Sequence, residues 1–322
     1  MKKILLILTT ILLLASCSSS NNSNTNNDSA YQVGILQFVE HPSLDDASQG
    51  FKDAIKDSGL EVDYQEQNAQ GDMSNSETIA TTFVNDGLDL IFANATPAAQ
   101  AAKSKTDTIP IVITSVTDPA ASGLVESNET GNTNVTGTSD MTPIVEQLDL
   151  LYQIVPDAKK IAIMYTSSEE NSIIQKDIAI EYLASISKDY VEASVADSTS
   201  IQAVTENLIG KVDAIYIPTD NLLAENTALV ASIANENNLP TVVGATGMVT
   251  DGGLASYGID YYQLGYQAGE MAVEILKGAD PKDMPIQYQD AARANLIINE
   301  SSLESLQLTL SDSIINDAEL VK

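Results

Sequence analysis

Residues 88–104 read LDLIFANATPAAQAAKS, a stretch that contains one strand and the start of one helix. Leu88 to Asn94 is a short apolar run of the kind that forms β-strands. Thr96 and Pro97 then fit a helix cap followed by a proline in the first turn. A strand followed directly by a helix is the unit from which parallel α/β sheets are built.

The same alternation continues along the chain from Tyr31 onward. The β-rich runs predict strands at residues 32–39, 60–65, 88–94, 109–115, 160–165, 190–194, 212–218, 239–243 and 253–257. Helical spacing predicts helices at residues 47–57, 76–85, 96–104, 144–155, 173–187, 201–209 and 226–237. The pattern occurs twice, on either side of a Gly-, Thr-, Asn- and Ser-rich stretch from Glu126 to Asp140. The sequence therefore predicts an α/β fold with two similar doubly wound parallel-sheet lobes and a ligand cleft between them.

The N-terminus has the features of a secretory signal. Two lysines precede an apolar run, residues 4–14, that is too short to span a membrane stably. The run ends in Leu14-Ala15-Ser16-Cys17, which resembles the lipobox of bacterial lipoproteins. We therefore expect a signal peptide at residues 1–16, a lipid on Cys17 and, because residues 17–30 are rich in Ser and Asn, a flexible tether. This arrangement predicts a lipid-anchored protein on the extracytoplasmic face of the cell membrane.

Composition excludes several classes of function. The chain has 45 acidic and 15 basic residues and no basic block, so the sequence offers no electrostatic support for nucleic-acid binding. It has a single cysteine and a single histidine, His41, which argues against a Cys/His zinc site and against a Cys-His nucleophile pair. A Gly-x-Ser-x-Gly motif is absent as well. We therefore expect neither an enzyme nor a bound metal or cofactor.

Polar residues follow most of the predicted strands, where a crevice at the carboxyl ends of the sheets would lie. They occur in residues 40–42, 95–97, 116–119, 166–171, 219–221, 244–246 and 258–260. Several of these groups precede helices, whose free N–H groups attract anions. Each group is about as well explained by helix capping and turn formation as by ligand contact.

Taken together, these strand-end segments resemble the substrate-binding lipoproteins of ABC importers, which have the periplasmic-binding-protein type I fold. Within that family the chain is similar to the group that includes tryptophan- and tyrosine-binding proteins. The resemblance rests on residues 38–45 with 50–51, 93–100, 116–119 with 123–125, 136–140, 165–172, 218–221 and 257–261.

The resemblance implies a hinged protein that closes on a small ligand, most simply an aromatic amino acid such as tryptophan, and delivers it to a membrane permease with its ATPase. One lobe would contain residues 31–139 and 259–287, and the other residues 140–258 and 288–322. The chain would cross between the lobes near residues 139–142, 257–260 and 286–290. The same resemblance implies a monomer without a cofactor.

An amino acid needs partners for its carboxylate, its ammonium group and its side chain. Thr96 and Thr117 are candidates for the carboxylate, and Asp118, Glu169 and Asp220 for the ammonium group, with Asn171 and Asn221 in support. The family pattern also places Glu40, Ser139, Asp140, Ser167 and Asp260 near the cleft or hinge. Phe38 and Tyr165 are candidates for an aromatic wall, and His41 for shaping the first cleft loop.

Other functions remain open on the sequence alone. A ligand-sensing receptor lipoprotein would use the same hinge, and the ligand could be a branched-chain amino acid or another small metabolite. A secreted hydrolase on this scaffold lacks its nucleophile and base. The effector domain of a transcription repressor is disfavoured by the signal sequence.

Overall fold

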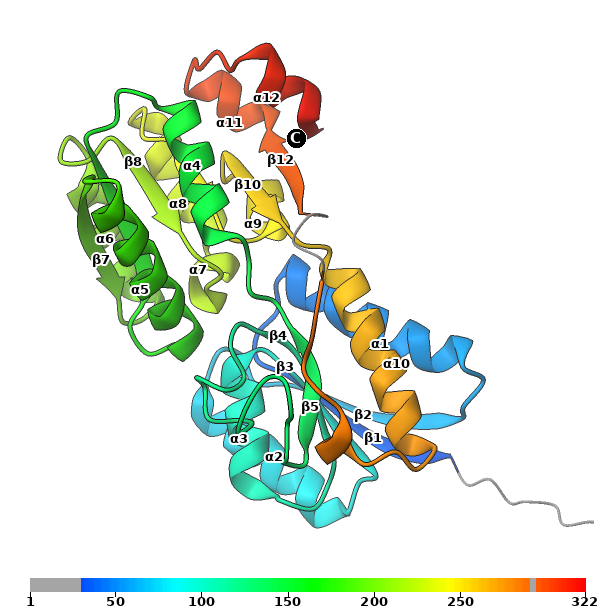
Figure 1. Ribbon diagram of the computed structural model, residues 1–322. Coiled ribbons are helices and arrows are strands. Elements are labelled where there is room, and N and C mark those ends of the chain that lie inside the picture. Colours follow the sequence, from blue (N-terminus) through cyan, green and yellow to red (C-terminus); the bar gives the residue numbers. More distant parts are fainter. Residues whose placement is uncertain (1–29, 290–293) are drawn as a thin grey trace, which may run out of the picture.

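The computed structural model describes residues 30–289 and 294–322, which form two α/β lobes (Figure 1). Each lobe is built on one sheet with helices on both faces, because the strands carry apolar side chains on both sides. The predicted fold class is confirmed, and each predicted strand overlaps an observed one. Cys17 and the predicted signal peptide lie outside the described residues. No helix in the described ranges is both long and apolar enough to cross a bilayer.

The first lobe contains a parallel sheet with the strand order β11-β5-β4-β3-β1-β2. These strands are β11 (Gln287–Tyr288), β5 (Val135–Ser139), β4 (Ile111–Val116), β3 (Leu90–Asn94), β1 (Tyr31–Gln37) and β2 (Val62–Asn68). Helices α1 (Pro42–Asp57) and α10 (Tyr261–Leu276) cover one face. Helices α2 (Met73–Asp86) and α3 (Thr96–Lys105) cover the other. A short 3-10 helix, η1 (Pro281–Asp283), follows α10.

The second lobe contains a sheet with the order β13-β12-β10-β9-β8-β6-β7. Its strands are β13 (Ala318–Val321), β12 (Asn295–Asn299), β10 (Ala255–Gly258), β9 (Thr241–Val243), β8 (Ala214–Ile217), β6 (Lys160–Thr166) and β7 (Asp189–Val195). This sheet is not wholly parallel as predicted, because β12 runs antiparallel to β10. The helices are α4 (Ile144–Ile154), α5 (Glu170–Ser185), α6 (Ser198–Leu208), α7 (Asn221–Glu225), α8 (Thr227–Glu236), α9 (Thr246–Thr250), α11 (Glu300–Ser305) and α12 (Asp312–Asp317).

Strand β5 lies inside the polar stretch at residues 126–140, where the sequence predicted none. Its residues are buried, and their hydroxyl groups are hydrogen-bonded: Thr138 pairs with Thr114 at 2.9 Å, and Thr136 donates to the Met284 carbonyl at 2.9 Å. Gly137 has φ +142°, and a Cβ there would lie 2.0 Å from the Ile113 carbonyl oxygen. Polar residues can therefore form a buried strand here because each polar group has a partner.

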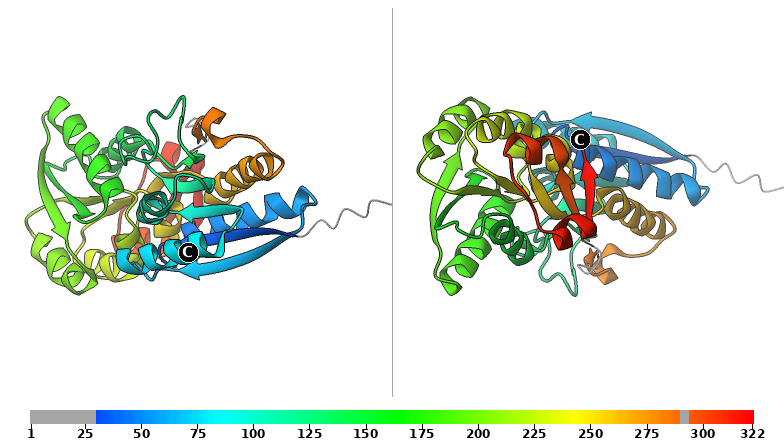
Figure 2. Two further views of the ribbon diagram at one scale, coloured as in Figure 1. Left: turned by 90° about the horizontal axis from the view of Figure 1, so that it is seen from below. Right: turned by 90° about the horizontal axis from the view of Figure 1, so that it is seen from above.

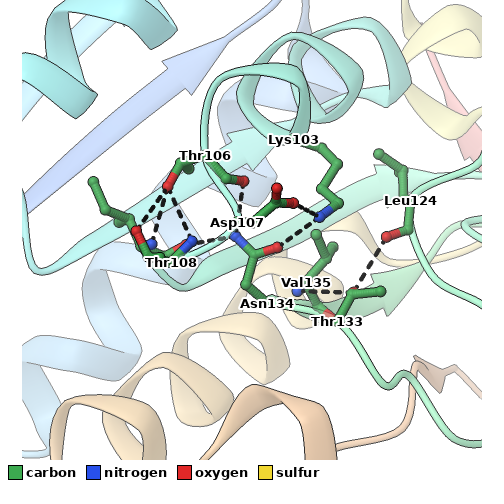
Figure 3. A network of polar contacts seen from close by, with 9 residues as sticks. Lys103, Thr106, Asp107, Thr108, Leu124, Thr133, Asn134 and Val135 are labelled. Carbon is green, nitrogen blue, oxygen red and sulfur yellow. Dashed lines mark hydrogen bonds and ion pairs between the residues drawn. The ribbon is translucent and has the colours of Figure 1, made fainter.

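A network of polar contacts holds the chain that enters β5 (Figure 3). The Asn134 side-chain amide donates to the carbonyls of Thr106 and Ile109 at 3.1 and 2.7 Å. Its carbonyl oxygen accepts from Lys103 at 3.0 Å. These contacts fix the start of β5 against the connection between α3 and β4.

Helix α10 follows β10 of the second sheet in sequence but packs on α1 in the first lobe, where the three views place the two helices side by side (Figures 1 and 2). The close approach depends on glycine. A Cβ on Gly265 would lie 1.9 Å from the Ala47 carbonyl oxygen, and one on Gly50 would lie 2.1 Å from the Tyr262 carbonyl oxygen. The chain passes between the sheets after β5, before α10 and between β11 and β12. The predicted third crossing ends at Asp290, which lies outside the described residues.

Candidate ligand-binding site between the lobes

A cavity of about 20 Å³ lies between the lobes, where the carboxyl ends of both sheets face each other. The first lobe lines it with residues from the start of α1, the end of β4, the end of β5 and the start of α10. The second lobe lines it with residues from α5, α7, α9 and the loops before α7 and α9. The lining residues are His41, Leu44, Ser115, Thr117, Asp140, Tyr261, Asn171, Thr219, Asp220, Asn221, Ala224, Ala245 and Met248. We call this space the inner cavity.

The end of β4 delivers Ser115 to the inner cavity through an irregular backbone. The register of β4 against β5 shifts between Ile113 and Val116, and Ser115 has φ +55°. A bulge of this kind redirects a side chain, and a positive φ in a non-glycine residue is a strained conformation that is common at functional sites. The Ser115 side chain is buried, and it lines the cavity as a result.

Four buried polar atoms of lining residues have no hydrogen-bond partner among the described residues. They are His41 Nε2 and Ser115 Oγ in the first lobe, and Asn171 Oδ1 and Thr219 Oγ1 in the second. Buried polar groups are nearly always satisfied in folded proteins, and an exception needs a reason. Two such atoms from each lobe around one cavity indicate a site whose polar groups form hydrogen bonds with a bound ligand.

Asp140 is the most exceptional lining residue, because its carboxylate is buried without a cation. One oxygen accepts from Thr117 at 3.2 Å and the other from Tyr261 at 2.8 Å. Neither Lys nor Arg is among the lining residues. Burial raises the pKa of Asp140 to about 6, although the two hydroxyl groups oppose this shift. The arrangement favours a positively charged group as the guest.

Asp220 also lines the inner cavity, but backbone and side-chain groups of its own lobe already bind its carboxylate. It accepts from the Thr166 amide at 2.6 Å, from the Thr166 hydroxyl at 2.8 Å and from the Leu223 amide at 2.9 Å. It thereby caps α7 and joins it to the end of β6. Burial raises the pKa of Asp220 although these hydrogen bonds oppose the shift.

Glu169 lies behind the inner cavity and binds the first turn of α7. Its carboxylate accepts from the Asn221 and Leu222 amides at 3.1 and 3.0 Å, and from the Asn221 side chain at 2.5 Å. The Asn171 side chain donates to it at 3.1 Å. Burial and the neighbouring Asp220 charge raise the pKa of Glu169 to about 7.

His41 lines the inner cavity from the position before α1. Burial lowers the pKa of His41 to about 4, with the Asn221 side chain opposing the shift, so the imidazole is neutral at pH 7. A neutral imidazole can donate from one nitrogen and accept at the other. The described residues contain no cluster of three His, Cys, Asp or Glu side chains that could hold a metal ion.

A second space of about 340 Å³, which we call the outer chamber, also lies between the lobes. The first lobe lines it with Phe38, Val39, residues 70–73 and Pro97, and the second lobe with Thr166, Ser168, Glu169, residues 196–198, Leu222 and Glu225. Among the sequence-predicted residues, Phe38 and Glu169 lie here. Its lining combines apolar, acidic and uncharged polar residues, and it contains neither Lys nor Arg.

Of the sequence-predicted residues, the inner cavity brings together Thr117, Asp140, Asn171, Asp220 and Asn221. The others lie elsewhere. Thr96 is buried with an unpartnered hydroxyl. It is the first residue of α3 rather than its cap, because Ala95, at φ +89°, occupies the cap position and hydrogen-bonds to Thr114. Ser139 binds the Thr117 carbonyl at 2.7 Å, within the first lobe.

The remaining predicted residues bind their own surroundings or solvent. Asp118 accepts from the Ala120 and Ala121 amides and from Asn128, at 3.2, 3.1 and 3.0 Å. The Tyr165 hydroxyl donates to Glu192 at 3.1 Å, and Lys176 lies over its ring. Glu40, Ser167 and Asp260 are exposed, and Asp260 caps α10 behind the hinge.

His41, which the sequence predicted to shape the first cleft loop, lines the inner cavity. Several other lining residues were not among the predicted site residues: Leu44, Ser115, Thr219, Tyr261 and Met248. Ser115 and Thr219 each lie beside a predicted residue at a strand end, which is the signal that could have found them. Tyr261 follows the predicted hinge segment directly. Leu44 and Met248 have no such signal, because an apolar residue on a helix is normally part of the core.

Residues 32–322 match the family described as ABC transporter substrate binding protein. A curated relative, the tyrosine-binding protein of Clostridioides difficile strain R20291, is 43% identical over 282 residues, which cover 86% of this chain and 81% of the relative. A Streptococcus pneumoniae ABC domain in complex with L-Trp is 34% identical and superposes with a TM-score of 0.87, covering 91% of this chain and all of that one.

A ligand-free, open substrate-binding protein from Clostridium difficile is 41% identical, and covers 91% of this chain and 99% of its own. Its TM-score is only 0.69, although it is more similar in sequence to this chain than the Trp complex, whose TM-score is 0.87. The lobes of the present structure are therefore arranged more as in the Trp complex than as in the open protein. The sequence match over nearly the whole chain and the shared two-lobed fold agree, and the protein belongs to the ABC transporter substrate-binding protein family.

Proposed function

We propose that this protein binds an aromatic amino acid, tyrosine or tryptophan, in the inner cavity and presents it to a membrane permease. Proteins of this family bind a small ligand outside the cytoplasm and work with a transporter. The named ligands of two relatives, tyrosine and L-Trp, support the choice of ligand. The observation that carries the proposal is the buried Asp140 carboxylate, which faces the cavity without a cation.

The ammonium group of the ligand pairs with Asp140 in this proposal. A charge-assisted bond to a buried carboxylate is among the strongest single contacts available to an amino acid. The ligand carboxylate takes donors without a formal charge, such as Ser115, Thr219 and His41, whose buried atoms have no partner in the described chain. A second acidic group on the ligand would lie near Asp140 and Asp220 with no Lys or Arg among the lining residues, so aspartate and glutamate are poor candidates.

The ligand side chain needs an apolar wall, and Leu44, Ala224 and Met248 provide one in the inner cavity. Phe38 lies in the outer chamber, whereas Tyr165 is turned toward Glu192 and Lys176. With the lobes in the present arrangement the inner cavity is narrow, about 20 Å³. In this proposal an amino acid enters when the lobes separate, and the lining side chains repack around it when the lobes close.

The proposal includes a hinge, an anchor and partners. The two lobes consist of residues 31–139 with 259–287 and residues 140–258 with 288–322, and they rotate about the three crossings between the sheets. A lipid on Cys17 holds the protein to the membrane, and it acts as a monomer with a permease and an ATPase. A thermal-shift screen tests the ligand assignment: the purified protein, refolded to remove any bound ligand, is heated with each of the twenty amino acids and with sugar and nucleoside panels.

The proposal predicts that tyrosine or tryptophan raises the melting temperature by several degrees, because a ligand at about 100 times its Kd stabilises by roughly 2.7 kcal/mol. Aspartate and glutamate serve as controls and should have no effect. A larger rise in melting temperature with a branched-chain amino acid or another compound would identify that compound, and not an aromatic amino acid, as the ligand. No rise with any amino acid would contradict the proposal.

A further inference from the structure

The start of α1 in the first lobe packs directly on α9 in the second lobe. This contact forms one side of the inner cavity, because His41 and Leu44 line it from α1, and Ala245 and Met248 line it from the region of α9. Any change in the distance between α1 and α9 therefore changes the separation of the lobes.

Gly247 lies at the centre of this contact. A Cβ at this position would lie 2.7 Å from Ser43 Oγ, 3.2 Å from Pro42 Cβ and 3.2 Å from the Ser43 amide nitrogen. The backbone of Gly247 does not have a positive φ, so its conformation suits any residue. Glycine is therefore required for the close approach of α1 and not for the local backbone.

Of the atoms nearest to a Cβ on residue 247, only the Ser43 hydroxyl oxygen can move without a shift of the α1 backbone. The Ser43 side chain is 2% exposed, and its hydroxyl has no hydrogen-bond partner in the described part of the chain. The hydroxyl can rotate away from a methyl group on residue 247. Pro42 and the Ser43 backbone cannot move without shifting α1, so a larger side chain on residue 247 meets a fixed wall.

We propose that Gly247 controls closure: the absence of a side chain there lets α1 of the first lobe seat on α9 of the second, and the size of residue 247 sets ligand affinity through the closed state. A side chain at this position acts as a wedge between the lobes. In the separated arrangement it faces open space, so it leaves the folding of each lobe unchanged. The inference rests on the proposed function in one respect, namely that the lobes close on a ligand.

The test is a series in which Gly247 is replaced by Ala, Val and Leu. Affinity is measured by calorimetry with the compound that gives the largest thermal shift in the screen. We expect a loss of about threefold for Gly247→Ala and of at least about tenfold for Gly247→Val and Gly247→Leu, because apparent affinity scales with the population of the binding-competent arrangement. Thr250→Leu, which enlarges an exposed residue of the same helix, is the control and should bind normally.

A double variant distinguishes the wedge from an effect on α9 itself. Replacing Ser43 by Ala removes the atom closest to the added methyl group. Ser43→Ala combined with Gly247→Ala should therefore return affinity to within about twofold of the wild-type value, since the two substitutions meet at one contact. Gly247→Leu should keep its loss in the same Ser43→Ala background, because Pro42 remains.

Small-angle X-ray scattering provides a second readout. The wild-type radius of gyration should fall on ligand addition, and that of Gly247→Leu should stay larger at the same ligand occupancy. Equal affinity and equal radius for wild type and Gly247→Leu would overturn the inference while leaving the proposed function intact. If no compound binds the wild type, the proposed function fails, and the unliganded radii decide the inference: a larger value for Gly247→Leu supports it, and equal values overturn it.

Discussion

Asp140 follows β5 directly and belongs to the first passage of the chain between the lobes, so its charge acts at both the cavity and the hinge. Its two hydroxyl partners, Thr117 and Tyr261, both belong to first-lobe elements. We expect Asp140→Asn to weaken amino-acid binding by about tenfold to a hundredfold, because a hydrogen bond to a charged group contributes roughly 1.5–3 kcal/mol. Calorimetry with tyrosine and tryptophan measures the loss.

Asp118→Asn is the matched control, since Asp118 lies in the first lobe but outside the inner cavity. An asparagine oxygen can still accept from the Ala120 and Ala121 amides. Its affinity for ligand should equal that of the wild type. Equal losses in the two variants would show that Asp140 does not contact the ligand.

The pH dependence of stability gives an independent test of Asp140. Burial raises the pKa of Asp140 from 3.8 to about 6, so the folded protein holds this proton more tightly than the unfolded chain. The contribution of Asp140 to the unfolding free energy is therefore fully present below about pH 4 and is lost as pH rises through 6. The total change is roughly 3 kcal/mol. Asn does not titrate. Relative to the wild type, Asp140→Asn should therefore gain stability between pH 4.5 and pH 7.5.

Urea unfolding of both proteins, without ligand, at several pH values measures this difference. His41, Glu169 and Asp220 titrate in both proteins and largely cancel in the comparison. A stability difference that stays constant between pH 4.5 and pH 7.5 would contradict the raised pKa of Asp140.

Residue by residue, the sequence could place polar groups at the crevice but could not say what they bind. Strand ends are recognisable, and the carboxyl ends of parallel strands in one sheet share an edge, which is how the sequence located Thr117 in the first lobe and Asp220 in the second. Asp140 follows a strand that the sequence did not predict, and only the family resemblance indicated it. Asp118 and Glu169 have equally suitable positions, yet they bind backbone N–H groups of a nearby turn and helix. The same side chains can cap a helix or contact a ligand, so only their contacts in the folded protein distinguish the two roles.

Among the elements, helix α10 packs in a different lobe from the strand that precedes it. It follows β10 of the second sheet but packs against α1, and Gly265 permits the contact with Ala47. Gly265→Ala should lower the unfolding free energy by about 1–3 kcal/mol, because a methyl group has no space between the two helices. Glu270→Ala, on the exposed side of α10, is the control. Equal melting temperatures for the two variants would contradict the glycine contact.

Strand β5 shows why element prediction failed for part of the chain. Its sequence, Val-Thr-Gly-Thr-Ser, has little apolar character, and composition alone assigned it to a connecting stretch. The strand forms because β4 on one side and β11 on the other supply backbone partners, while Thr114 and the Met284 carbonyl satisfy its hydroxyl groups. These partners are distant in sequence, and no local pattern reveals them.

At the scale of the whole molecule, both lobes contribute residues to the candidate ligand site. Thr117 of the first lobe accepts from Gln175 of the second at 3.3 Å, and Gln175 also binds the Thr219 backbone. The inner cavity is thus complete only when the lobes are together. Under the proposed function, this dependence of the site on closure lets the protein present a different shape to a transporter with and without ligand.

A crystal structure of the protein grown with tyrosine tests the central claim most directly. The account predicts one tyrosine between the lobes, with its ammonium nitrogen about 2.7–3.0 Å from the Asp140 carboxylate and its carboxylate near Ser115 and Thr219. The Asp118 and Tyr165 side chains should not contact the ligand. A tyrosine held by its ammonium group on Asp220 or Glu169, or bound outside the space between the lobes, would contradict the account.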